Sequence, residues 1–203
     1  MRDKFENIYM NNLWEHGSGE GSLPIHTKGY AKFVEHFLTI YNICSVVDLG
    51  CGDWQFSRFI NWGDTTYHGY DIVQSVIDSN KAKFESDKTL FHLYTGDPIN
   101  LPKADLIIAK DVLQHWSNNN IEKFLPLLSK YKYFLITNCI NPNGKTVNIN
   151  IEDGEFRFLD LRREPFSLQS EIVYEFTNKQ NLVDKILFRK PRWHKISLSN
   201  ACI

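Results

Sequence analysis

The fold of this chain is decided by the stretch Ser45–Val46–Val47–Asp48–Leu49–Gly50–Cys51–Gly52–Asp53. An apolar, β-branched run enters a Gly-x-Gly turn, and the apolar spacing that follows predicts a helix over residues 54–60. Glycine has no Cβ, so such a turn can bend sharply and approach a ligand, while the first N–H groups of the next helix are unpaired. The pattern predicts a small-molecule site, although such turns also serve to pack a helix closely on a strand.

An acidic residue closes the next strand-like run, residues 67–72, which contains Asp71. It follows the glycines by about twenty residues, where doubly wound folds place a carboxylate that binds ribose hydroxyls. We therefore predict that Asp71 is a ribose ligand. Gln55 stands where a dinucleotide-binding Gly-x-Gly-x-x-Gly would need its third glycine, which argues against a dehydrogenase.

Four segments in this order resemble the motif set of class I S-adenosylmethionine-dependent methyltransferases. They are residues 46–53, 69–72, 96–97 and 104–116. The family often carries a further glycine where this chain has Trp54. The resemblance implies S-adenosylmethionine as the cofactor and a Rossmann-like fold.

The order of predicted elements agrees with that fold. Strand-like and helical runs alternate, which predicts an α/β fold with a doubly wound, mostly parallel sheet and helices on both faces. The resemblance implies seven strands ending in a C-terminal antiparallel hairpin, for which residues 171–177 and 182–189 are the expected pair, and residues 146–151 alternate like an edge strand. Further helices are expected over residues 29–41, 73–84 and 121–130, and strands over 67–72, 90–94, 105–109 and 133–138.

We expect a single methyltransferase domain over residues 1–203. Residues 1–28 form an N-terminal arm, 29–140 the cofactor-binding core, and 141–203 an acceptor-side insertion with the terminal hairpin. The arm contains a glycine- and serine-rich segment, residues 16–22, which is typical of a flexible linker. We interpret it instead as a lid that closes over the cofactor and excludes water.

The resemblance also implies which residues bind the cofactor. The turn is formed by Asp48, Gly50, Cys51 and Gly52. Ribose and adenine are contacted by Asp71 and Ile72, and the adenine edge by Gly96 and Asp97. The methionine end lies near Lys110 and Asp111. Gly96-Asp97-Pro98 is also a common turn sequence.

Three residues are predicted to take part in the chemistry. Methyl transfer from a sulfonium requires alignment and, for a hydroxyl acceptor, removal of a proton. His115 is the predicted base, because imidazole accepts a proton near neutral pH, although it could equally form a pocket wall. Asp111 lies beside it at the strand end, and His16 is a second base that the arm could carry over the site.

The acceptor is predicted from three further side chains. Trp14 lies beside the glycine-rich segment, and Arg162 and Arg163 lie in the insertion after the fifth core strand. Paired arginines suit a carboxylate or phosphate, although a solvated pair is also common. The prediction is a small anionic acceptor, such as a sugar, sugar nucleotide or glycan unit, methylated on oxygen.

Composition narrows the alternatives. A net charge of −1 over 203 residues gives no overall field for nucleic acid or an anionic membrane, although basic residues gather in the last third. Four scattered cysteines indicate neither a disulfide framework nor zinc, and no signal peptide or membrane-spanning run is present, which favours a cytoplasmic protein. We identify no metal ligand set. RNA or protein methylation, and a cofactor-binding module without catalysis, remain alternative functions.

Overall fold

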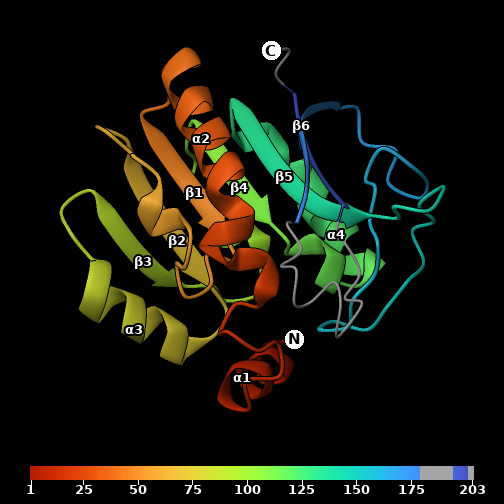
Figure 1. Ribbon diagram of the computed structural model, residues 1–203, viewed down its shortest axis with the longest axis horizontal. Helices are drawn as coiled ribbons and strands as arrows, with labels where there is room; N and C mark the ends of the chain where they lie inside the picture. Colours follow the sequence, from red (N-terminus) through yellow and green to blue (C-terminus); the bar gives the residue numbers. More distant parts are fainter. Residues whose placement is uncertain (179–193, 201–203) are drawn as a thin grey trace.

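The computed structural model describes residues 1–178 and 194–200, and within them seven strands form one sheet (Figure 1). The strand order is β3-β2-β1-β4-β5-β7-β6. The first five strands pair in parallel, whereas β7 is antiparallel to both of its neighbours. The strands are β1 (Ser45–Leu49), β2 (Thr66–Asp71), β3 (Thr89–Leu93), β4 (Leu106–Lys110), β5 (Tyr133–Ile140), β6 (Glu171–Thr177) and β7 (His194–Ser199).

Helices cover both faces of the sheet. Adjacent residues of a strand point to opposite faces, so Val46 packs in one apolar cluster with α2 and α3, and Val47 packs in another with α4. The helix α1 lies apart from both faces, beyond the ends of the parallel strands (Figure 1). The helices are α1 (Arg2–Met10), α2 (Pro24–Ile40), α3 (Gln74–Phe84) and α4 (Asn118–Phe124), the last continued by a 3₁₀ helix over Leu125–Lys130. None of the described helices combines the length and apolar character needed to cross a membrane.

The predicted fold class is confirmed: the sheet is mostly parallel, has seven strands and ends in an antiparallel pair. The partner of β6 in that pair is His194–Ser199, whereas the expected run 182–189 lies outside the described residues.

Two predicted elements are wrong. Residues 54–60 form turns and a short 3₁₀ helix, Ser57–Phe59, in place of an α-helix. Trp54 has a positive φ of 59°, and its ring packs between Tyr67 and Phe91 at centroid distances of 5.6 and 5.3 Å. Its apolar character therefore serves an aromatic cluster and not a helix face. Residues 146–151 form no strand either, because they run as irregular chain.

Candidate active site

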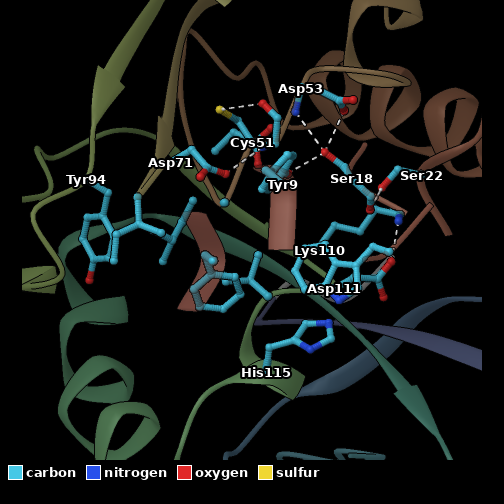
Figure 2. A pocket seen from close by; sticks show the side chains of 18 of the residues that line it. Tyr9, Ser18, Ser22, Cys51, Asp53, Asp71, Tyr94, Lys110, Asp111 and His115 are labelled. Carbon is cyan, nitrogen blue, oxygen red and sulfur yellow. Dashed lines mark hydrogen bonds and ion pairs between the residues drawn. The ribbon is translucent and has the colours of Figure 1, made fainter. Parts of the chain in front are cut away.

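A cavity lies where the carboxyl ends of β1, β2 and β4 meet the N-terminal arm (Figure 2). We call it the glycine-turn cavity. Open α/β sheets bind ligands at this edge, on the side of the strand ends. Its lining comprises Met1, Phe5, Tyr9, Trp14, Ser18, Ser22, Asp48, Leu49, Gly50, Cys51, Gly52, Asp53, Gln55, Phe56, Asp71, Ile72, Tyr94, Lys110, Asp111, Val112, His115 and Trp116.

The glycine turn and Asp71 form one hydrogen-bonded unit. Gly50 and Gly52 have φ values of 72° and 56°, in the left-handed region that favours glycine. Asp71 accepts from Gly52 N and from Val73 N, each at 3.0 Å. Burial nevertheless raises the pKa of Asp71 to about 6, because these bonds offset only part of the desolvation. The carboxylate is held in place by the backbone and has no cation beside it among its hydrogen-bond partners.

Asp48 lies in β1, just before the glycine turn. Tyr67 donates its hydroxyl to Asp48 Oδ2 at 2.6 Å, in the buried interior between β1 and β2. Burial raises the pKa of Asp48 to about 7, against the lowering effects of Tyr67 and Lys110. Cys51, also buried, has a thiol pKa raised by burial and so is not a thiolate at neutral pH. Both residues line the glycine-turn cavity.

The N-terminal arm lies directly on the glycine turn. Ser18 Oγ donates to Asp53 Oδ1 at 2.7 Å and accepts from Asp53 N at 2.9 Å (Figure 2). The Tyr9 hydroxyl lies 2.7 Å from Ser18 Oγ. Because Ser18 has already donated its only hydroxyl proton, Tyr9 is the donor in this third bond. A Cβ on Gly52 would come within 2.2 Å of Ser18 Oγ. The second glycine is thus required by the close approach of the arm as well as by its φ. We call this Tyr9–Ser18–Asp53 contact the arm latch.

Two lysines enclose the carboxylate of Asp111. Lys110 Nζ lies 2.6 Å from Asp111 Oδ2, and Lys195 Nζ, from β7, contacts the same oxygen. Both lysine side chains are buried, and their charges hold the pKa of Asp111 well below its usual range despite its burial. Lys110 Nζ also donates to Gly21 O at 3.2 Å, so the glycine-rich segment lies over this cluster.

His115 is held in the tautomer that a base requires. Its Nδ1 lies 2.8 Å from Glu155 O, and because a carbonyl only accepts, Nδ1 carries the proton and Nε2 has a lone pair. Burial lowers the pKa of His115, which favours the neutral ring. The Trp14 ring lies across from it, with 5.1 Å between ring centroids.

Several predicted site residues lie outside the cavity lining. His16 has an exposed side chain, and it is its carbonyl that accepts a hydrogen bond, from Gln55. Asp97 is exposed and caps a short 3₁₀ helix by accepting from Ile99 N at 3.0 Å. Asp97 and Gly96 line a separate, neighbouring cavity. Arg162 and Arg163 both pair with Asp160. The structure does not bring these residues to the glycine-turn cavity.

Three residues of the site were not singled out from the sequence. Tyr9 and Ser18 lie in the expected N-terminal arm, residues 1–28, and only the fold reveals that they meet. Lys195 is 84 residues from Asp111 in the chain, so the spacing of the motifs does not connect the two residues. A lysine inside an apolar strand pattern, Lys195-Ile196-Ser197-Leu198, was the available signal, because lysine is seldom buried without a partner.

Comparison with known proteins agrees with this fold. Residues 47–130 match a family model described as a methyltransferase domain. Magnesium protoporphyrin IX methyltransferase from Synechocystis PCC 6803, crystallised with bound SAH, has a TM-score of 0.63 at 15% identity, covering 98% of this chain and 95% of its own. TehB from Haemophilus influenzae has a TM-score of 0.58 at 15% identity, covering 83% and 60%.

A human protein is similar to a smaller extent. N-acetylserotonin methyltransferase, in complex with SAM, has a TM-score of 0.54 at 14% identity, covering 83% of this chain and 50% of its own. No curated protein sequence matches this chain. Residues 47–130 thus match a methyltransferase domain, and the fold of the chain is that of class I S-adenosylmethionine-dependent methyltransferases. The resemblance seen in the motifs is confirmed.

Proposed function

We propose that the glycine-turn cavity binds S-adenosylmethionine and that the protein methylates an oxygen atom of a small, anionic acceptor. One observation carries the proposal. The ribose-type carboxylate of Asp71 and a neutral His115, whose unprotonated Nε2 lies 3.5 Å from Gln114 Nε2, line the same cavity, at the strand ends of a class I methyltransferase fold. Related folds crystallised with SAH or SAM support the choice of cofactor.

The side chains present fit this cofactor. Asp71 is anchored by two backbone N–H groups and keeps lone pairs for the ribose hydroxyls. Ile72 offers an apolar surface for adenine, and beside it the buried Tyr94 hydroxyl has no hydrogen-bond partner among the described residues. An orphaned buried hydroxyl is costly and suits a polar edge of a ligand. Lys110 and Asp111 would face the methionine end.

The chemistry asks little of the protein beyond alignment and one proton transfer. S-adenosylmethionine supplies a methyl group on a positively charged sulfur. The acceptor oxygen forms a bond to that methyl carbon while the carbon–sulfur bond breaks, and the sulfur keeps the electron pair. The hydroxyl proton passes to His115 Nε2, whose opposite nitrogen is tied to Glu155 O and so fixes the ring. Asp111 is already paired with two lysines. It holds these lysines in position and does not accept the proton.

The arm encloses the reaction. Trp14 packs against His115, and the arm latch ties the same segment to the glycine turn. A closed site excludes water, which strengthens the electrostatic interactions inside and protects the sulfonium from hydrolysis. The enclosure also supports a small acceptor over a macromolecule, because bulky chains would require the arm to be displaced. This is the lid role expected for residues 16–22.

Calorimetric titration with S-adenosylhomocysteine tests cofactor binding. Asp71→Asn removes one acceptor of the ribose contact, so we expect affinity to fall by about tenfold or more, since a hydrogen bond to a charged group is worth about 1.5–3 kcal/mol. Asp97→Asn is the matched control, because Asp97 is exposed and lies outside the cavity lining. No binding to the wild type, or equal losses in both variants, would contradict the proposal.

Turnover is then measured as S-adenosylhomocysteine released from S-adenosylmethionine over a panel of small hydroxy acids and sugar phosphates. His115→Gln keeps cofactor binding and loses turnover by about a hundredfold or more, the usual contribution of a general base. An active His115→Gln variant would make His115 a wall of the pocket.

A further inference from the structure

Two buried lysines share a single carboxylate at the end of β4. Lys110 and Lys195 are 7% and 2% exposed, and Asp111 is the only carboxylate within ion-pair distance of either in the part of the chain that the structure describes. The cluster therefore has one more positive charge than it has negative charges. A buried charge without a counter-ion is costly, so the cluster favours an additional anion.

The uncompensated charge belongs to Lys110. Burial lowers the pKa of Lys110, and Lys195 adds to that effect, although Asp111 opposes both. Burial also acts against Lys195, yet Asp111 raises the pKa of Lys195 above its usual value. The charge of Lys110 extends to Asp48, but burial raises the pKa of Asp48 to about 7, so this carboxyl group is only partly ionised at neutral pH. Asp111 thus stabilises Lys195 in full and Lys110 in part.

Lys110 is also the lysine that a ligand can reach. It lines the glycine-turn cavity together with Asp111, whereas Lys195 does not. An ammonium group has three N–H donors. Two of those on Lys110 are donated to Asp111 Oδ2 and Gly21 O, and the third has no acceptor among the described residues. An anion in the cavity would supply that acceptor and balance the charge.

The surroundings of Lys110 and His115 indicate the rest of the ligand. Both residues line the glycine-turn cavity, and Figure 2 shows both away from Asp71. The centroid of the Phe56 ring lies 5.0 Å from Lys110 Nζ, and the Trp14 ring centroid lies 5.1 Å from that of His115. Aromatic walls of this kind favour a ligand with an apolar or aromatic body that carries few polar groups.

We propose that Lys110 binds the carboxylate of the acceptor while His115 receives the proton of its hydroxyl group, so that the acceptor is a hydroxy acid with a single negative charge. The proposal rests on the methyltransferase function proposed above and names the class of its acceptor. One surplus positive charge is balanced by one carboxylate, whereas a phosphate dianion would leave a surplus negative charge beside Asp111. The arginine pair expected from the sequence to bind the acceptor is already bound to Asp160.

The stability of the free protein tests the charge assignment. Lys110→Met removes the surplus charge and leaves Asp111 with Lys195, so we expect the midpoint of thermal unfolding to stay within about 2 °C of the wild-type value or to rise. Lys195→Met removes the lysine that Asp111 stabilises and should lower the midpoint further. Lys83→Met, an exposed position of α3, controls for the change in net charge. A loss in Lys110→Met as large as that in Lys195→Met would overturn the proposal, because Lys110 would then serve only to neutralise Asp111.

Calorimetric titration measures the contact with the ligand. Protein saturated with S-adenosylhomocysteine is titrated with 3-hydroxybenzoate and, as the uncharged analogue, with 3-hydroxybenzamide. We expect the acid to bind saturably, the amide to bind at least about tenfold more weakly, and Lys110→Met to lose about tenfold in affinity for the acid alone. Lys83→Met should bind the acid as the wild type does. No saturable binding of the acid, or equal affinities of acid and amide, would overturn the proposal.

The cofactor carries a carboxylate of its own, so its affinity is measured in the same proteins. We expect Lys110→Met to bind S-adenosylhomocysteine within about threefold of the wild type. If the variant lost affinity for S-adenosylhomocysteine but not for 5′-methylthioadenosine, which lacks the amino-acid end, Lys110 would bind the cofactor and not the acceptor. A wild type that binds neither compound would contradict the proposed methyltransferase function, whereas normal cofactor binding without binding of the acid would contradict only the role of Lys110.

Discussion

Two aspartates, Asp71 buried and Asp111 partly buried, follow the strands on either side of β1, and their charges are stabilised in opposite ways. Asp71, at the end of β2, is 7% exposed and is bound by backbone N–H groups. Asp111, just after β4, has a side chain 15% exposed and is enclosed by two lysines. Burial raises the pKa of Asp71 to about 6, whereas the lysines lower the pKa of Asp111.

The difference shows which carboxylate is available to a ligand. Asp111 is neutralised by the protein and serves to hold Lys110 and Lys195 in place. Asp71 is fixed in position but electrostatically unsatisfied, so donors from a ligand improve its surroundings. A site that must bind and release a ligand benefits from the second arrangement, because a carboxylate committed to internal lysines offers little further binding energy.

The largest expected effect comes from removing the charge of each aspartate in turn. Asp111→Asn leaves two buried lysines without their counter-ion, so we expect the free energy of unfolding at pH 7 to fall by about 3–5 kcal/mol. Asp71→Asn loses one backbone hydrogen bond but relieves a buried charge, for a loss of about 1–2 kcal/mol. Urea denaturation of both variants measures the contrast, and equal losses would show that the two carboxylates are not handled differently.

The pH dependence of cofactor affinity sharpens the comparison. The pKa of Asp71 is raised to about 6, so the ionised form that accepts ribose hydroxyls is present above that pH and is lost as pH falls through it. Affinity for S-adenosylhomocysteine should therefore fall by up to about tenfold per pH unit below 6. Asp111 remains ionised throughout and contributes no such step. The measurement is calorimetric titration with S-adenosylhomocysteine from pH 5 to 8. Asp71→Asn is the control, and its affinity should not change with pH. A wild-type affinity that is equally independent of pH would contradict the prediction.

The smallest effect concerns the arm that covers the Asp71 side of the cavity. Tyr9→Phe keeps the ring and removes the hydroxyl that donates to Ser18 at 2.7 Å, so we expect unfolding to become easier by about 0.5–1.5 kcal/mol. Ser18→Ala breaks the arm latch at its centre, and the double variant should lose less than the sum. Strict additivity, measured by thermal unfolding, would mean that the two residues do not act as one latch.

The sequence predicted the surroundings of the glycine turn better than those of the segment after β5. Gly50, Gly52 and Asp71 belong to a single local pattern, in which strand, turn and next strand are close in the chain, so spacing alone places them together. The helix expected at residues 54–60 failed because an apolar period does not distinguish a helix from Trp54 packing sideways into an aromatic cluster.

The surroundings of the segment after β5 depend on contacts between distant segments. Arg162 and Arg163 attracted notice as a pair, yet Asp160, two and three residues away, neutralises both. Arg157 is a lone arginine among apolar residues, and its burial follows only from the path of the irregular segment after β5. Lys195 likewise becomes part of the site because β7 lies beside β5. The local periodicity of a sequence does not predict such contacts between distant segments.

The position of β7 between β5 and β6 bears on how the protein is made. During translation β6 leaves the ribosome before β7, the strand that links it to the sheet, has been synthesised. The five parallel strands can assemble by then, but Asp111 lacks the buried ammonium of Lys195 until β7 inserts. A nascent chain stalled before residue 194 would thus carry the glycine turn and Asp71 without a finished charge cluster around Asp111.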